Sequence, residues 1–238
     1  MPTASSILSE LKKKGTAQAR KIYARHGMTT ASMFGVSMAD LKPIAKKIKD
    51  QQALACELYE TGNFDAMYLA GLVADGSQLS EKQLNDWAER AEGLRMISEY
   101  TIPWVTTDNP RARELALKWI ASKREHIASS GWRTYSALMS KEPDENLDLS
   151  EIQKLLNTVV KQIKTAPNRL RYNMNGFVIS VGSHVKPLLK QAKDAAKKIG
   201  AVSVDVGETD CKVPLASAYI EKIEAAGRVG KKVKTVRC

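Results

Sequence analysis

A helical spacing of apolar residues recurs along nearly the whole chain, and it restricts the fold more than any other feature of the sequence. Leu41, Ile44 and Ile48, for example, share one face of a predicted helix at residues 37–49. Comparable segments follow at residues 5–14, 18–26, 53–61, 64–74, 80–91, 97–105, 109–121, 126–139, 150–165, 169–182, 186–199 and 213–226. The pattern predicts an all-α protein.

Only one stretch has the alternation typical of a strand. Val202, Val204 and Val206 alternate with polar residues, but the run is short, and we expect an extended loop rather than part of a sheet.

Residues at several helix ends match known capping and turn preferences. Ser80 followed by Gln83 is a capping-box pair, and Gly27 ends the second helix. Pro110 is expected in the first turn of its helix, and Pro103 should kink the 97–105 segment or start a helix there.

Short loops between these helices favour stacked antiparallel pairs. Helices of this length suit an α-α superhelix, a solenoid whose concave face forms a groove, and a compact helical bundle is the alternative. Because no linker rich in Pro, Gly or Ser divides the chain, we expect a single domain at residues 1–226, followed by a basic tail at residues 227–238.

Charge is the strongest compositional fact. The chain of 238 residues has a formal net charge of +11, which suggests a polyanionic partner, with nucleic acid first. No apolar run approaches the roughly 18 residues of a membrane-spanning helix, and the N-terminus lacks the apolar core of a signal peptide. We therefore expect a cytoplasmic protein without membrane contact.

The cysteines and histidines show no ligand pattern. Three of each are scattered, without a CxxC pair, an HxxxH pair or an HExxH motif. We expect no metal and no cofactor.

The segment RLRYNMNGFVISVG, residues 169–182, has two seams at helical spacing. Leu170, Met174, Phe177 and Val181 form an apolar seam that predicts core packing. The second seam is small and polar, and it consists of Arg169, Asn173, Gly176 and Ser180. Glycine removes side-chain bulk and asparagine can donate to phosphate, so this seam suits close approach of a DNA backbone. Close helix–helix packing is the equal alternative.

Several segments, taken in order, resemble the AlkD-type alkylpurine DNA glycosylases, DNA-alkylation-repair proteins built from HEAT-like repeats. They are GVSMADLKPIAKKI (35–48), FDAMYLAGLVAD (64–75), EYTIPWV (99–105), ALKWIASKREHIASSGWRTYSAL (116–138) and NRLRYNMNGFVIS (168–180). The resemblance covers roughly residues 20 to 190. It implies a concave basic surface that holds duplex DNA by its backbone and removes cationic N3- or N7-alkylated purines.

The resemblance also implies site residues. The family places an aspartate four positions before a proline, and a tryptophan four before that; counted from Pro103, these positions hold Glu99 and Arg95. A register shifted by one residue gives Ser98 and Leu94 instead. Glu99 is thus the catalytic candidate, because a carboxylate can stabilise oxocarbenium character at the sugar.

The DNA-binding candidates are spread over three segments. The family arginine corresponds to Arg133, which is expected near the start of an apolar helix, and the second family tryptophan corresponds to Phe177. Trp132 beside Arg133, and Arg169, Asn173 and Gly176 on the polar seam, complete the central set. Further positive charge lies on one face of the 37–49 helix and in the tail: Lys42, Lys46, Lys49, Lys231, Lys232, Lys234 and Arg237.

Three hypotheses follow. The first is a DNA N-glycosylase for alkylated purines. The second is a relative that binds unusual or damaged DNA without excising bases. The third is a helical scaffold for protein interactions. In the first two the partner is duplex DNA, damaged or structured, bound by a monomer that associates with the nucleoid.

Overall fold

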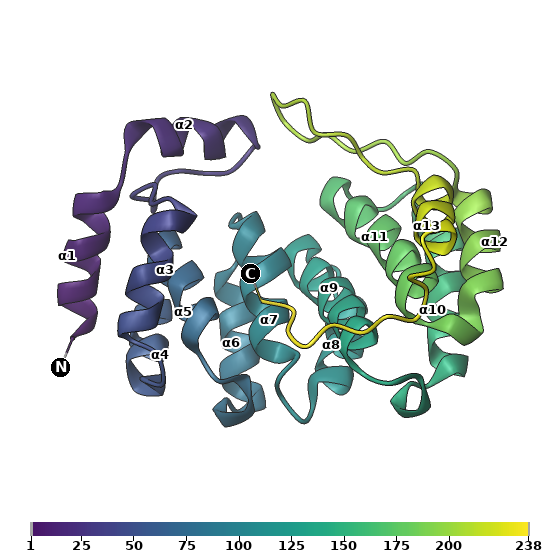
Figure 1. Ribbon diagram of the computed structural model, residues 1–238. Helices are drawn as coiled ribbons and strands as arrows, with labels where there is room; N and C mark the ends of the chain where they lie inside the picture. Colours follow the sequence, from purple (N-terminus) through teal and green to yellow (C-terminus); the bar gives the residue numbers. More distant parts are fainter. Residues whose placement is uncertain (1, 238) are drawn as a thin grey trace. The chain divides into compact units, whose positions relative to one another are not determined.

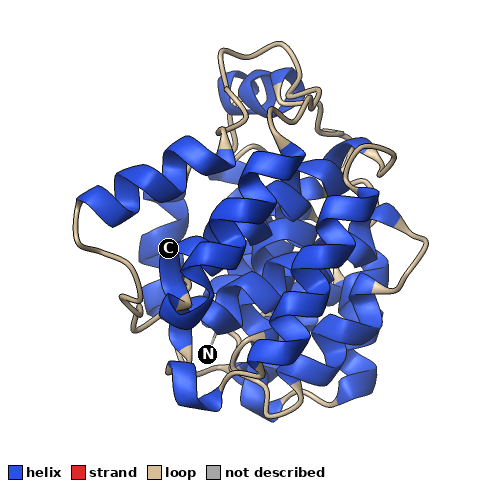
Figure 2. Ribbon diagram, turned by 90° about the vertical axis from the view of Figure 1, so that its right-hand side faces the viewer, coloured by secondary structure: helices blue, strands red, loops and turns tan. Residues whose placement is uncertain are grey.

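The computed structural model describes residues 2–237. Within that range the chain consists of thirteen α-helices, three short 3-10 turns, one π-helical turn and loops, without any strand (Figure 2). The all-α prediction is confirmed. None of these helices is both long and apolar enough to cross a membrane.

The chain divides into two compact units. Unit 1 comprises residues 2–111, Val206–Asp210 and Arg237, and unit 2 comprises Ala112–Asp205 and Cys211–Val236. The expected single domain at residues 1–226 stays a prediction.

Unit 1 contains the first seven helices (Figure 1). They are α1 (Ala4–Lys14), α2 (Ala17–Arg25), α3 (Met38–Lys47), α4 (Gln52–Glu60), α5 (Phe64–Val73), α6 (Glu81–Arg90) and α7 (Ile102–Thr106). A π-helical turn, η2 (Ile97–Thr101), leads directly into α7. Pro103 lies in the first turn of α7, which agrees with the prediction that a helix starts near this proline.

Helix α5 runs through the core of unit 1. Every residue from Phe64 to Gly71 is buried, including the carboxylate of Asp65. Asp65 accepts hydrogen bonds from the backbone N–H groups of Phe34, Gly35 and Val36 at 2.6, 3.1 and 2.8 Å. These bonds compensate the cost of burying a charge and fix the loop that precedes α3.

Unit 2 contains the remaining six helices. They are α8 (Ala112–Ile120), α9 (Glu125–Lys141), α10 (Leu149–Gln162), α11 (Asn168–His184), α12 (Leu189–Ile199) and α13 (Ala216–Ala225). Helix α11 lies at the centre of the unit, where it contacts α9, α10, α12 and α13. Its Gly182 faces Ile220 of α13 so closely that a Cβ would lie 2.6 Å from Ile220 Cδ1.

The 3-10 turns η1 (Gly76–Gln78), η3 (Asp144–Asn146) and η4 (Lys186–Leu188) lie between helices. The predicted capping box at Ser80 and Gln83 is present, and Gly27 follows α2 with φ +71°, so both predictions are confirmed. The prediction for Pro110 is wrong, because α8 begins only at Ala112.

Residues 202–206 form a loop that belongs to no strand, as predicted, whereas the helix expected from residue 213 begins only at Ala216. In unit 2, Asp205 exchanges two hydrogen bonds with the side-chain amide of Asn168, at 2.7 and 2.9 Å. In unit 1, the Glu208 N–H donates to Arg25 O at 2.8 Å. Gly207 next to it has φ +80° and leaves no room for a Cβ against Arg25 O, so only glycine fits there.

The basic tail contains no acidic residue of its own, and acidic side chains from elsewhere in the chain hold it in place. In unit 2, Lys232 Nζ contacts Asp144 Oδ1 at 2.8 Å and donates to the carbonyls of Met139 and His184. In unit 1, Arg237 Nη2 contacts Asp108 Oδ2 at 2.6 Å. Two of the five cations in the tail sequence are therefore already paired.

Candidate nucleic-acid interface

Helices α9 and α11 pack against each other through aromatic side chains. The rings of Trp132 and Phe177 meet edge to face with centroids 4.9 Å apart, and Tyr135 contacts Phe177 at 6.0 Å. The apolar seam predicted for residues 169–182 is confirmed, since Met174, Phe177 and Val181 are at most 2% exposed and Leu170 packs against the same core. Trp132 and Phe177 are 1% and 0% exposed, so neither ring reaches solvent.

Arg133 and Gly176, two DNA-binding candidates from different segments of the sequence, are neighbours in the structure. A Cβ built on Gly176 would lie 4.0 Å from Arg133 Nη1, so the guanidinium of α9 lies beside the position on α11 that has no side chain. Arg133 is in the middle of α9 and half-buried, not near a helix start as expected. The α9 boundary explains the difference, because the helix continues two turns before Arg133.

The two arginines of α11, Arg169 and Arg171, are also half-buried. The Cζ of Arg169 lies 4.4 Å from the centroid of the Tyr172 ring, a cation–π contact that fixes the guanidinium along the helix surface. The Nε of Arg171 is buried and has no hydrogen-bond partner among residues 2–237. Arg171 lies about 200° round the helix from Arg169, so it points away from Gly176. Arg133, Arg169 and Gly176 are called the arginine surface below.

Asn173 lies inside this layer rather than on it. The residue is 1% exposed, and its Nδ2 donates to the backbone carbonyl of Arg169 at 3.0 Å. Its Oδ1 is buried without a hydrogen-bond partner in the described part of the chain.

Glu125, which the sequence analysis did not single out, holds the start of α11. Its Oε1 accepts from the backbone N–H of Arg169 at 2.6 Å and of Leu170 at 3.4 Å. Pro167 is the N-cap of α11 and provides no side-chain cap, so a carboxylate from α9 takes that role at the positive end of the helix. No local sequence signal could reveal a cap supplied from more than forty residues away.

The catalytic candidate, Glu99, belongs to unit 1. It lies in the π-helical turn η2 and is 2% exposed. The turn packs tightly against α5, where a Cβ on Gly71 would lie 2.5 Å from Thr101 Cγ2. A π-helical turn is a rare element that often occurs at functional sites.

Lys42 and Lys46, the candidates on α3, are exposed. Lys46 lines a hollow of about 530 Å³ in unit 1 together with Lys49 and Arg237. Asp50, Asp75 and Asp108 line the same hollow and offset much of its positive charge. Hydrogen bonds from the Ser77 and Gln78 side chains, and the nearby Arg237, hold the pKa of Asp75 below its ordinary value.

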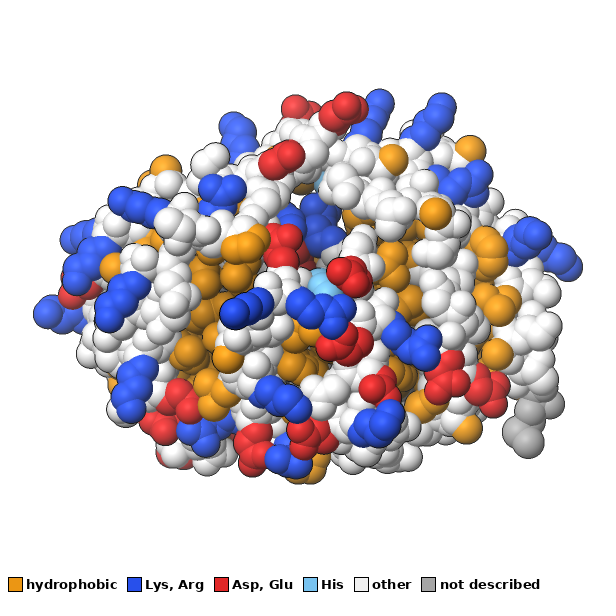
Figure 3. Space-filling model, turned by 180° about the vertical axis from the view of Figure 1, so that it is seen from behind, with side chains coloured by type: hydrophobic (Ala, Val, Ile, Leu, Met, Phe, Trp, Pro, Cys, Tyr) orange, Lys and Arg blue, Asp and Glu red, His pale blue; other side chains and the backbone are white. Residues whose placement is uncertain are grey.

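On the face of the molecule that Figure 3 shows, Lys and Arg side chains alternate with acidic and apolar side chains and are not confined to one site. Nowhere in residues 2–237 do three or more His, Cys, Asp or Glu side chains gather in a way that could hold a metal ion.

Comparison with known proteins agrees with this architecture. A solved structure described as "a new family of proteins related to the HEAT-like repeat DNA glycosylases with affinity for branched DNA structures" is 37% identical, covers 100% of both chains and gives a TM-score of 0.90. This confirms the predicted HEAT-like all-α fold.

Two curated relatives are similar along almost their whole length. The proteins Lin0241 of Listeria innocua and Lmo0209 of Listeria monocytogenes are each 31% identical over 225 residues, which is 93% of this chain and 97% of the relative. The family model "DNA alkylation repair enzyme" matches residues 7–200. The chain therefore belongs to the DNA alkylation repair enzyme family.

Proposed function

We propose that this protein binds branched DNA through its phosphate backbone, using the arginine surface of unit 2, and that it does so without excising bases. The observation that carries the proposal is the guanidinium of Arg133 beside Gly176. A guanidinium binds a phosphate through two parallel hydrogen bonds, and a glycine beside it lets the sugar–phosphate chain come close to the helix.

Charge and kinship support the same proposal. The net charge of +11 favours a polyanion over a neutral protein partner, which weighs against the scaffold hypothesis. The similar solved structure belongs to proteins with affinity for branched DNA, and the similarity extends over the full length of both chains.

Burial of the candidate catalytic groups favours binding over excision. A glycosylase needs a carboxylate at the deoxyribose of the bound nucleotide. Glu99 is only 2% exposed, and the aromatic candidates Trp132 and Phe177 are 1% and 0% exposed. None of the three can touch a bound duplex while the surrounding helices keep their packing.

Binding is tested by fluorescence anisotropy with a four-way DNA junction and a linear duplex over a range of salt concentrations. We expect the junction to bind more tightly, and the affinity to fall steeply with salt. Arg133→Gln should weaken binding about tenfold and reduce the slope against salt by about one. Lys123→Gln, an exposed single-charge change in the same unit, is the matched control. If neither DNA binds at low salt, the scaffold hypothesis replaces this one.

Excision is tested separately on duplex DNA containing N7-methylguanine and N3-methyladenine. We expect no base release beyond the spontaneous rate. Release that disappears in Glu99→Gln would restore the glycosylase hypothesis and show that η2 opens to expose the carboxylate.

We further propose that the binding form is a monomer in the cytoplasm that associates with the nucleoid through DNA. A monomer gives a molar mass of 26.2 kDa in analytical ultracentrifugation, and twice that mass would contradict it.

A further inference from the structure

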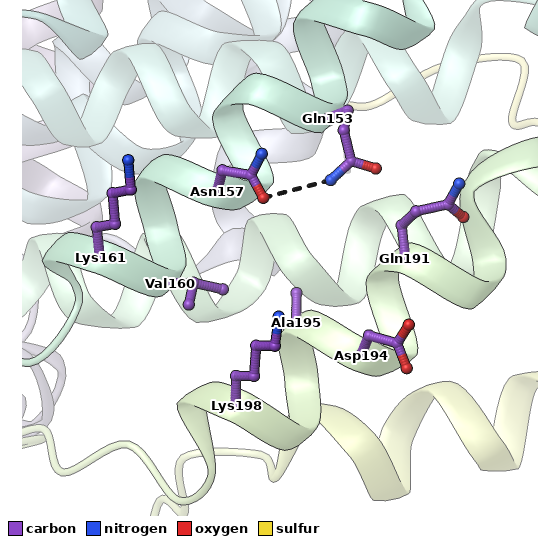
Figure 4. Close-up of a pocket in the computed structure, with 8 residues that line it drawn as sticks. All are labelled: Gln153, Asn157, Val160, Lys161, Gln191, Asp194, Ala195 and Lys198. Carbon is purple, nitrogen blue, oxygen red and sulfur yellow. Dashed lines mark hydrogen bonds between the residues drawn. The ribbon is translucent and has the colours of Figure 1, made fainter.

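Unit 2 has a second basic feature, a groove between α10 and α12 (Figure 4). Its volume is about 360 Å³, and the polar side chains that line it are Gln153, Asn157, Lys161, Gln191, Asp194 and Lys198. We call it the amide groove. The arginine surface lies on α9 and α11, whereas all residues lining the amide groove come from α10 and α12.

The two helices present their polar faces to this groove and their apolar faces to the core. On α10, Ile152, Leu156 and Val159 are buried, and the groove residues of that helix lie about 100° further round. On α12 the buried residues are Ala192, Ala195, Ala196 and Ile199. Ala195, with Val160 of α10, forms the apolar part of the groove lining, and the polar side chains of the lining lie outside the core.

The chemistry of the groove is suited to a sugar–phosphate chain. Figure 4 shows Lys161 and Lys198 at the same end of the groove, with the amides of Gln153 and Gln191 at the other end. Lysine ammonium groups and side-chain amides are common donors to phosphate oxygens.

The amides also have hydrogen-bonding capacity to spare. Gln153 donates to Asn157 over a long 3.4 Å, which leaves the amino group of Asn157 for a ligand. Gln191 Oε1 is buried without a hydrogen-bond partner among the described residues, and rotation of that amide would turn two N–H donors to the same place.

Charge around the groove favours an anionic occupant. Asp194 is the acid on its lining, and it is outnumbered by Lys161 and Lys198. Exposed lysines also stand elsewhere on the same helices, at Lys154, Lys190 and Lys197.

We propose that the amide groove is a second phosphate-binding surface, which takes a second arm of branched DNA while the arginine surface holds the first. This rests on the proposed function. A branched DNA carries several duplex arms on one molecule, so once one arm is bound the second binds at a high effective concentration. A short linear duplex has no second arm and gains nothing from the groove.

The test compares Lys161→Gln combined with Lys198→Gln against wild type on a four-way junction and on a short linear duplex. We expect junction affinity to fall about tenfold and its slope against salt to fall by about two, whereas duplex affinity stays within about twofold. Lys123→Gln combined with Lys222→Gln removes the same charge from exposed positions of unit 2 outside both surfaces. That control should change neither affinity by more than about twofold.

A second measurement does not depend on variants. Lysines of wild-type protein are acetylated with and without DNA and then quantified by mass spectrometry. Lys161 and Lys198 should be protected by the junction and not by the short duplex, whereas Lys123 and Lys222 stay reactive throughout.

The outcomes separate the two proposals. Three results would each overturn the proposal for the amide groove and leave the proposed function standing. The groove variant could bind the junction as tightly as wild type does, it could lose equal affinity for junction and duplex, or the junction could fail to protect the groove lysines. Failure of wild type to bind either DNA would overturn both and leave the groove to an acidic protein partner.

Discussion

Two glycines in the helices of unit 2 have opposite surroundings. A Cβ on Gly131 would lie 2.5 Å from Ile120 N and 2.8 Å from Ala116 O, so α9 crosses α8 in direct backbone contact there. A Cβ on Gly176 would meet only Arg133 Nη1, at 4.0 Å. The first glycine permits packing, and the second leaves space at the surface.

The two alanine variants should therefore change stability in opposite directions. Gly131→Ala forces the two helix backbones apart and should cost about 3 kcal/mol of unfolding free energy. Gly176→Ala fits without a clash and should gain up to about 1 kcal/mol, because alanine restricts the unfolded chain. Urea denaturation followed by circular dichroism measures both. A destabilised Gly176→Ala would mean that the space beside Arg133 is already filled.

A larger side chain at the same position tests binding rather than stability. Gly176→Leu should push the Arg133 guanidinium aside and weaken junction binding about tenfold, whereas Gly176→Ala should leave it within about twofold. Anisotropy titrations at one salt concentration compare the two variants. Equal affinities for both would remove Arg133 from the interface.

At this scale the sequence predicts residue types better than their surroundings. Arg133 and Gly176 stand out from composition and family position, but only the packing of α9 on α11 shows that they are neighbours. The same packing buries Trp132 and Phe177 together. The burial of Glu99 could not be foreseen, because it depends on a π-helical turn that no spacing rule predicts.

At the scale of elements, the start of α11 depends on another helix. Removal of the Glu125 carboxylate in Glu125→Ala leaves the N–H groups of Arg169 and Leu170 without their acceptor, and should cost about 1–2 kcal/mol. Glu125→Gln keeps an oxygen in place and should cost less. The unfolding midpoints of the two variants give the order, and an equal loss in both would mean that the charge, not the acceptor, is what matters.

The C-terminal segment gives unit 2 a dependence on pH. His184 Nδ1 lies 2.8 Å from the carbonyl of Lys231, so Nδ1 carries the hydrogen and donates. Burial, with a smaller contribution from Lys232, lowers the pKa of His184 below its ordinary 6.5. The unfolded chain therefore binds a proton more readily than the folded one, and acid favours unfolding.

The expected result is full stability above the ordinary pKa of histidine and a loss as the pH falls through it toward the lower pKa of the folded state. His184→Asn keeps an N–H donor that does not titrate, so the urea midpoint of this variant should fall less between about pH 7 and about pH 5. An unchanged pH profile in His184→Asn would mean that His184 is not the source of the loss.

Apolar spacing predicted the positions of almost all helices. The exact start of a helix could be predicted only where a nearby residue caps it, as Ser80 and Gln83 do for α6. The start of α8 was misplaced, because Pro110 suits a first turn but lies in the loop before the helix. Local sequence rules do not predict at which of several neighbouring residues a helix starts, because tertiary packing decides this.

At the scale of the whole molecule, the net charge of +11 hides which cations are available to a ligand. Lys232 and Arg237 are paired with acids 88 and 129 residues away in sequence, so the basic tail contributes less free charge than its composition indicates. Those distances along the chain explain why the sequence alone could not predict the pairs.

Lysines that only attract DNA from a distance and residues that contact it should have different effects on the rate constants of DNA binding. Lys82, Lys123 and Lys222 are exposed and lie outside both proposed surfaces. Replacement of all three by Gln should lower the association rate constant about threefold, because the field that attracts the DNA weakens, and leave the dissociation rate unchanged.

Arg133→Gln should do the reverse and act mainly on dissociation, because it removes a contact made only in the complex. Stopped-flow measurements at two salt concentrations distinguish the two effects, and the association rate of the triple variant should be less sensitive to salt than that of wild type. If the triple variant instead dissociates faster by as much as Arg133→Gln does, the dispersed lysines are themselves contacts. DNA would then cover more of the protein than the two proposed surfaces.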